Sequence, residues 1–116
     1  MPYIAIKTSL ELSEEKMEKV KTEIGRLITI LANKTEAVTM VDFCDCRTFY
    51  KAGVKIEGAM IELRLWGKSE FEEKKNFTEE LFKLLTTELG LKPENMSLNV
   101  LEFNDWGSGG TLKSRT

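Results

Sequence analysis

The chain has 116 residues, which is enough for one domain with a single hydrophobic core but leaves no room for a second module. Its composition, 41% hydrophobic and 31% charged, is globular and excludes a disordered chain. The net charge of −2 comes from interspersed lysines and glutamates without a basic stripe, so we expect neither a nucleic-acid partner nor a membrane partner.

The first half of the chain reads as strand, helix and strand. Residues 2–8 are apolar and partly β-branched, which favours a strand. Ser13 is the expected N-cap of a helix whose apolar residues recur at three- and four-residue steps: Met17, Val20, Ile24, Leu27, Ile28 and Leu31. Asn33 is the expected left-handed stop, residues 38–44 form the next predicted strand, and a short hairpin turns at residues 52–53.

The second half repeats this order. Residues 59–66 are predicted to form a strand, and Ser69 with Glu72 matches a capping box at the start of a helix. The apolar face of that helix contains Phe77, Leu81, Leu84 and Leu85. Gly90 is its expected end, and residues 96–103 form the last long predicted strand.

The two halves align in register, which indicates an internal duplication of about residues 2–45 and 59–104. Aligned pairs include Ile4 with Ile61, Ile24 with Leu81, and Asn33 with Gly90. Each half is a β-α-β unit with parallel strands and a right-handed crossover. The sequence therefore predicts one α/β domain over residues 1–116, an α+β sandwich with a four-stranded sheet and two helices on one face. The other sheet face would lack cover, so we expect an oligomer.

The absence of histidine restricts the possible chemistry. It excludes Ser-His-Asp and Cys-His nucleophiles, and two cysteines cannot complete a tetrahedral zinc shell. Acid–base catalysis near neutral pH must then come from a shifted carboxylate, lysine or cysteine, or from the N-terminal amine. The pair Cys44 and Cys46 is interpreted as two small apolar residues without a redox role.

Pro2 could supply such a base. Removal of Met1 is expected when proline follows it, and removal leaves a secondary amine at the chain end. Burial and neighbouring cations would both lower the pKa of that amine, which favours the neutral base. The alternative is that proline only opens an edge strand, where no N–H is needed.

Several short motifs accompany this proline. They are Met1-Pro2-Tyr3-Ile4, Asn33-Lys34, Trp66-Gly67-Lys68, Leu91-Lys92-Pro93-Glu94, Leu98-Asn99 and the tail from Asp105 to Thr111. With the duplicated β-α-β plan, they resemble the macrophage migration inhibitory factor (phenylpyruvate tautomerase) group of the tautomerase superfamily from Pro2 to about Leu112.

This resemblance implies a homotrimer without metal or organic cofactor, in which Pro2 interconverts keto and enol forms of a 2-oxo acid. It further implies that Lys34 holds the substrate carboxylate, that the backbone at Trp66 contacts substrate, and that Asn99 reaches the site from the neighbouring subunit. Trp106 either lines the pocket or only packs the tail.

Arg64 leaves open a second hypothesis about the reaction. It forms either a surface ion pair with Glu62, two residues earlier on the strand, or a carboxylate grip, because guanidinium binds carboxylate with two hydrogen bonds. The latter would fit superfamily hydratases, decarboxylases or dehalogenases that act on small acids. Trp66 and Ser97 depart from the family pattern and would also fit a non-enzymatic, cytokine-like binding protein.

Two expectations concern the ends of the chain. No apolar run is long enough to span a bilayer, and early charges such as Lys7 and Glu11 do not fit a secretory signal, so we expect a cytoplasmic protein. The glycine-rich residues 107–110 lack the lysine and following helix of a phosphate loop, and we expect them to form a flexible terminus.

Overall fold

The structure is a computed structural model that describes residues 1–115. Its elements in chain order are β1 (Tyr3–Thr8), α1 (Glu14–Leu27), η1 (Ile28–Ile30), η2 (Glu36–Val38), β2 (Met40–Cys44), β3 (Phe49–Lys51), β4 (Val54–Ile56), β5 (Ala59–Trp66), α2 (Phe71–Leu89), η3 (Pro93–Asn95), β6 (Met96–Phe103), β7 (Asp105–Ser108) and β8 (Thr111–Ser114). Four of the strands form the central sheet in the order β2-β1-β5-β6.

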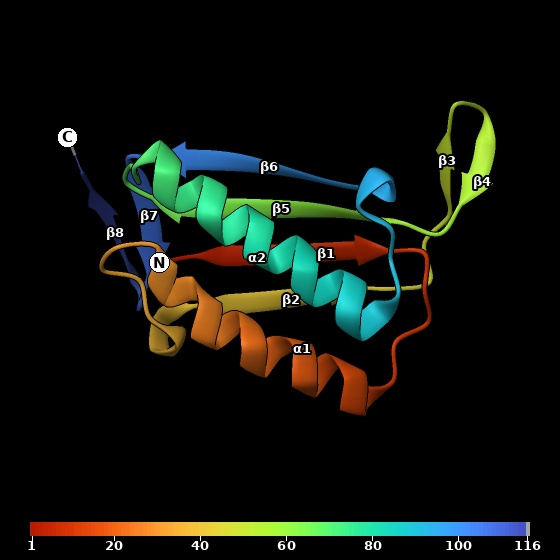
Figure 1. The fold of residues 1–116 in the computed structure, drawn as a ribbon. Coiled ribbons are helices and arrows are strands. Elements are labelled where there is room, and N and C mark those ends of the chain that lie inside the picture. Colours follow the sequence, from red (N-terminus) through yellow and green to blue (C-terminus); the bar gives the residue numbers. More distant parts are fainter. Residues whose placement is uncertain (116) are drawn as a thin grey trace.

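The sheet has the predicted duplicated plan. Strands β1 and β2 are parallel, β5 and β6 are parallel, and the two halves join through an antiparallel pairing of β1 with β5. Both α-helices cover the same face of this sheet (Figure 1). The predicted fold class, with two β-α-β units and two helices on one face, is therefore confirmed.

Local capping explains where the helices begin and end. The hydroxyl of Ser13 accepts a hydrogen bond of 3.1 Å from the backbone N–H of Lys16, so Ser13 is the N-cap, as predicted. Asn33 adopts a left-handed conformation with φ of 64°, although α1 has already ended at Leu27 and passed into η1. Gly90, with φ of 70°, is the left-handed C-cap of α2.

The predicted capping box at the start of α2 is wrong. Glu70 occupies the N-cap position and its side chain makes no capping hydrogen bond. The backbone N–H of Ser69 instead donates to the carboxylate of Glu102 on β6, at 2.7 Å. A partner on a neighbouring strand has therefore replaced the local one at Glu72. The predicted strand 38–44 also starts later, because Glu36–Val38 forms a 3-10 turn before β2.

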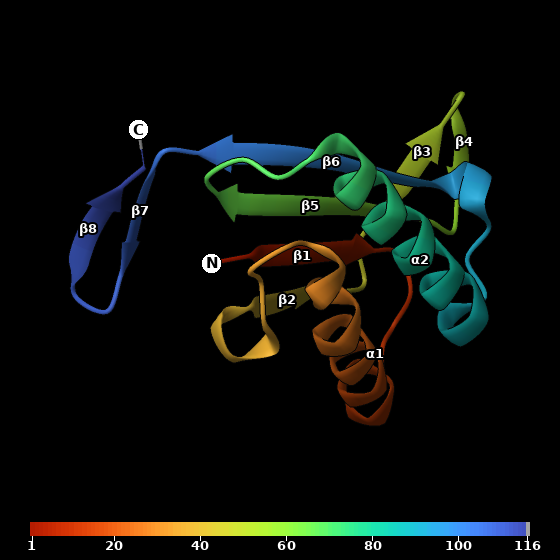
Figure 2. The same ribbon diagram turned by 60° about the vertical axis from the view of Figure 1, so that its left-hand side comes forward.

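The glycine-rich tail is ordered, which corrects the expectation of a flexible terminus. Strands β7 and β8 pair as an antiparallel hairpin. Gly109 and Gly110 provide its turn with φ values of 61° and 88°, which residues with a side chain rarely adopt. The hairpin extends away from the four-stranded sheet at the end where β6 finishes (Figure 2).

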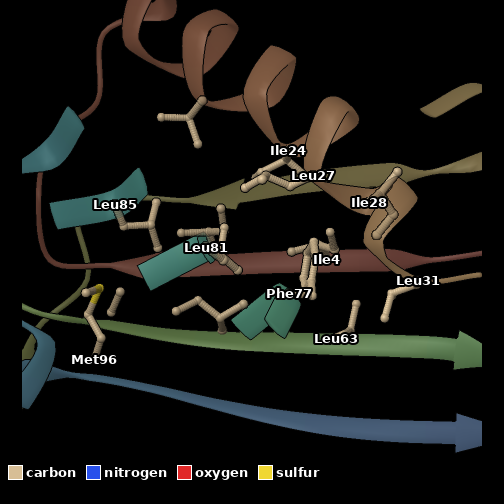
Figure 3. Packing of buried hydrophobic residues seen from close by; sticks show 14 of the residues in the cluster. Ile4, Ile24, Leu27, Ile28, Leu31, Leu63, Phe77, Leu81, Leu85 and Met96 are labelled. Atoms are coloured by element: carbon tan, nitrogen blue, oxygen red, sulfur yellow. The ribbon is translucent and has the colours of Figure 1, made fainter. Parts of the chain in front are cut away.

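The core lies between the sheet and the helices. Phe77 of α2 is fully buried there and points toward the sheet among Ile4, Leu63 and Leu81 (Figure 3). The opposite sheet face carries polar side chains that bond to one another, including Tyr3 with Asp42 and Lys7 with Glu62. No helix within residues 1–115 is long and apolar enough to cross a membrane.

Candidate active site

A cavity of about 480 Å³ opens at the start of β1. Its lining residues are Met1, Pro2, Tyr3, Val38, Met40, Arg64, Phe103, Asp105, Trp106, Gly107 and Ser108. Pro2 is buried, and its carbonyl accepts a hydrogen bond of 3.0 Å from the backbone N–H of Met40. This hydrogen bond between the beginnings of β1 and β2 therefore fixes the proline at the cavity wall.

The far wall of this cavity is aromatic. Phe103, the last residue of β6, and Trp106 of β7 pack edge to face with ring centroids 6.2 Å apart. Trp106 therefore lines the cavity and does not only pack the tail. This wall offers an apolar surface for the uncharged part of a small molecule.

Arg64 enters the same cavity from β5. It lies opposite Tyr3 in the strand register, and its guanidinium carbon is 5.4 Å from the centroid of the Tyr3 ring. Its Nη2 donates to Glu62 at 3.0 Å, while Lys7 donates to the other oxygen of Glu62 at 2.7 Å. The predicted ion pair between Arg64 and Glu62 is therefore present.

Tyr3 does not act as an acid or base near neutral pH in this setting. Its hydroxyl donates to Asp42 at 2.6 Å, and this hydrogen bond, with burial and the negative charge of Asp42, raises the pKa of Tyr3 to about 12. The phenol therefore remains protonated and keeps the polar sheet face fixed beside Pro2.

Lys34 approaches the N-terminus from the helix layer. The left-handed turn at Asn33 places it, and its backbone N–H donates to the carbonyl of Leu31 at 3.1 Å. Its side chain is only 7% exposed, and Nζ donates to the carbonyl of Trp66 at 3.2 Å. Burial lowers the pKa of Lys34 and so does the nearby charge of Arg115, while Glu102 opposes them.

The sequence did not predict a role for Arg115, a cation near the N-terminal amine; like Lys34 and Trp66, it is not among the residues that line the cavity. Its guanidinium carbon lies 4.0 Å from the centroid of the Trp66 ring, which is cation–π geometry. Its backbone N–H donates to the carbonyl of Asn104 at 2.7 Å, and the indole N–H of Trp66 donates to the same carbonyl at 2.8 Å. No sequence pattern marks an arginine near the chain end, because only the hairpin brings it back to β5.

The N-terminal amine is the titratable group with the largest functional interest. In this structure it belongs to Met1, and its pKa is lowered from 8.0 to about 6. Burial is the largest cause, followed by the positive charges of Lys34 and Arg115. The amine of Met1 is therefore mostly neutral at pH 7 and can accept a proton.

Asn99 is not brought to this site within one chain. It is exposed on the face of the sheet that the helices leave uncovered and pairs in register with Glu62. It precedes the end of β6 at Phe103 by four residues, about 13 Å along a strand. Asn99 does not line the cavity.

Two other chemical possibilities find no support among residues 1–115. No group of three or more Cys, Asp or Glu side chains there could hold a metal ion. Cys44 and Cys46 are both free thiols, and the sulfur of Cys44 lies 3.6 Å from an oxygen of Asp42. Neither cysteine lines the cavity.

Comparison with known proteins identifies the fold. No family model matches the sequence, and no curated protein matches it either. Among solved structures, MIF2 of Leishmania major superposes with a TM-score of 0.90 at 21% identity, covering 97% of each chain. The chain has the MIF/tautomerase fold.

Other structures with the tautomerase fold differ in their named chemistry. Pt0534, solved after inactivation by 2-oxo-3-pentynoate, matches at 18% identity and a TM-score of 0.82 over 93% of each chain. N1, a member of the cis-3-chloroacrylic acid dehalogenase family, matches at 18% identity and 0.83, covering 96% of this chain and 82% of its own. These likenesses confirm the predicted tautomerase fold, while the activity rests on the site.

Proposed function

We propose that this protein is a keto–enol tautomerase acting on a phenylpyruvate-like 2-oxo acid, with the amine of Pro2 as the acid–base group after removal of Met1. The observation that carries this proposal is that Pro2 is buried at the wall of a cavity with an aromatic side, where the neighbouring amine of Met1 has its pKa lowered to about 6. The same burial and cations would lower the pKa of the Pro2 amine once Met1 is removed, which suits a general base at neutral pH.

The proposed reaction needs one group to move one proton. The neutral amine of Pro2 removes a proton from the carbon next to the keto group, the electrons of that C–H bond form the C=C bond of the enolate, and the π electrons of the C=O bond move to the oxygen. The resulting ammonium returns a proton to complete the enol, or to the carbon in the reverse direction. Lys34 would hold the substrate carboxylate, the backbone of Trp66 would border it, and Phe103 with Trp106 would contact its apolar part.

The experiment compares the two prolines of the chain. Pro2→Ala, or protein that retains Met1, should lose tautomerase turnover by at least about a hundredfold, the low end of general acid–base contributions. Pro93→Ala is the control. Pro93 lies in η3, just before β6 begins, whereas the cavity lies where β6 ends, so this variant should keep full activity. Activity that survives both changes at Pro2 would exclude the proposed base.

Arg64 favours a second candidate, a hydratase, decarboxylase or dehalogenase of small unsaturated acids. Its guanidinium lines the cavity that contains Pro2, where it could grip a carboxylate. The ion pair with Glu62 weighs against this role, because that carboxylate already occupies it. If no 2-oxo or unsaturated acid is turned over, the non-enzymatic, cytokine-like alternative gains support.

A homotrimer is part of the proposed function. The face of the sheet opposite the helices has no covering element among residues 1–115, and Asn99 is exposed on it. Leu101, also on β6, is 46% exposed there. A neighbouring copy seated along this face would both cover Leu101 and bring Asn99 toward a site of another subunit.

A further inference from the structure

Trp66 contacts two cations at once. Its carbonyl accepts the hydrogen bond from Lys34, and its ring lies 4.0 Å from the guanidinium carbon of Arg115. Its own indole N–H and the backbone of Arg115 share the carbonyl of Asn104. One residue at the end of β5 therefore holds a lysine from the helix layer and an arginine from the C-terminal hairpin side by side.

These two cations differ from the other lysines and arginines near the sheet. Lys7 and Arg64 pair with Glu62, and Lys74 pairs with Glu102 at 3.0 Å. Neither Lys34 nor Arg115 forms an ion pair with any carboxylate within residues 1–115. The two like charges repel, and burial and Arg115 lower the pKa of Lys34 although Glu102 opposes them, so an anion bound beside the pair would be stabilised.

Gly67 makes the approach of Arg115 possible. It has a positive φ of 79°, and a Cβ placed there would lie 3.0 Å from Cδ of Arg115. A side chain at position 67 would therefore crowd that of Arg115 where it packs on Trp66. The side chain of Arg115 remains exposed at its outer surface, where a ligand can reach the guanidinium.

We propose that Arg115 is a further substrate-binding residue, which holds the carboxylate of a 2-oxo acid jointly with Lys34 beside the N-terminal amine. This inference rests on the proposed function for the identity of the anion. Lysine supplies a compact charge, whereas the planar guanidinium can donate two parallel hydrogen bonds to one carboxylate. Together they would fix both the position and the orientation of the acid.

The two cations also act on the amine. Lys34 and Arg115 are the charges that lower the pKa of the N-terminal amine, while Glu102 acts on Lys34 in the opposite direction. Loss of either cation should raise the amine pKa. Because the charge of Arg115 acts on the amine without any bound acid, the amine pKa reports only the position of this charge, and binding of the acid must be measured separately.

The test uses phenylglyoxylate, a 2-oxo acid that has no hydrogen on the carbon beside its keto group and cannot enolise. Calorimetric titration of the full chain should show that Arg115→Gln weakens phenylglyoxylate binding about tenfold, close to one charge-assisted hydrogen-bonded contact. Its methyl ester should bind equally to both proteins. NMR titration of Pro2 should show a raised amine pKa in Arg115→Gln.

Two variants serve as controls for this experiment. Arg115→Lys keeps the charge but not the planar fork, so it should restore the lowered amine pKa and only part of the affinity. Lys113→Gln removes an exposed cation from β8, two residues before Arg115, and should match the unaltered protein. Wild-type affinity in Arg115→Gln, equal losses for acid and ester, or an amine pKa that stays raised in Arg115→Lys would each overturn the inference.

The result is separable from the proposed function, because phenylglyoxylate reports binding without turnover. A protein that binds the acid through Arg115 but shows no activity dependent on Pro2 would retain this inference and refute the tautomerase. Conversely, activity that depends on Pro2 but not on Arg115 would retain the tautomerase and refute this inference.

Discussion

Lys34 and Arg64 are both cations near Pro2, but their hydrogen-bond partners differ in charge. Arg64 is held by Glu62 at 3.0 Å, and that carboxylate also accepts from Lys7. Lys34 is buried against a backbone carbonyl and has Arg115 as its charged neighbour. A substrate carboxylate would have to displace Glu62 from Arg64, whereas Lys34 forms no ion pair among residues 1–115 and has only the more distant charge of Glu102 opposite it.

We therefore expect Lys34→Ala to raise KM for an anionic 2-oxo acid about tenfold and to affect the uncharged ester much less. Removing this cation also favours protonation of the amine, so its pKa rises. Because only the neutral amine accepts a proton, the acidic limb of the pH–rate profile should move to higher pH. Activity should then fall more at pH 6 than at pH 8.

Arg64→Ala is the matched comparison. If Arg64 were the carboxylate grip, its loss would harm turnover of the acid more than Lys34→Ala does, and the second candidate function would replace the tautomerase. Steady-state kinetics with acid and ester over a pH series measure both effects. If neither variant distinguished acid from ester, the site would not recognise a carboxylate through these two residues.

At the scale of elements, the periodic sequence predicts the strands and helices well because their signals are local. Apolar spacing identified α1, α2 and the long strands, and Ser13 and Gly90 marked helix boundaries through their own backbone chemistry. The predictions failed where a residue distant in the sequence supplied the hydrogen-bond partner. Glu102 took the N–H of Ser69, and the pairing of β7 with β8 ordered a glycine-rich tail.

The candidate site shows the same division. The role proposed for Pro2 follows from its place in the sequence, and the roles proposed for Lys34 and Trp66 follow from the resemblance to a known family. Arg115 could not be predicted, because its place depends on the hairpin that returns the chain to β5. The contact between residues 66 and 115 exists only in the folded protein.

Helix α2 offers a direct test of the predicted core. Phe77 is fully buried, so Phe77→Ala should lower the free energy of unfolding by about 3–5 kcal/mol through lost burial and a residual cavity. Phe71, at the start of the same helix, is 70% exposed, and Phe71→Ala should change stability by no more than about 0.5 kcal/mol. Urea unfolding followed by circular dichroism measures both; similar losses would contradict the described packing.

At the scale of the whole molecule, the uncovered sheet face leads us to expect an oligomer. We expect sedimentation equilibrium at micromolar concentration to give about three times the chain mass of 13.2 kDa. Leu101→Asp places a charge on that face and should shift the protein toward monomers, because burying an unpaired charge is costly. Thr22→Asp, on the exposed side of α1, should leave the assembly intact. A wild-type monomer would remove the shared site from the proposal.

The positions of Pro2 and Arg115 have a practical consequence. Both lie at the end of the sheet where the cavity opens, whereas the hairpin of β3 and β4 lies at the opposite end (Figures 1 and 2). A purification tag or fusion partner at either terminus would therefore crowd the reactive amine or pull Arg115 from Trp66. The turn at Ala52 and Gly53 is exposed, and a Cβ at Gly53 would meet nothing within 4 Å. An affinity handle inserted at this turn would keep immobilisation chemistry away from both chain ends.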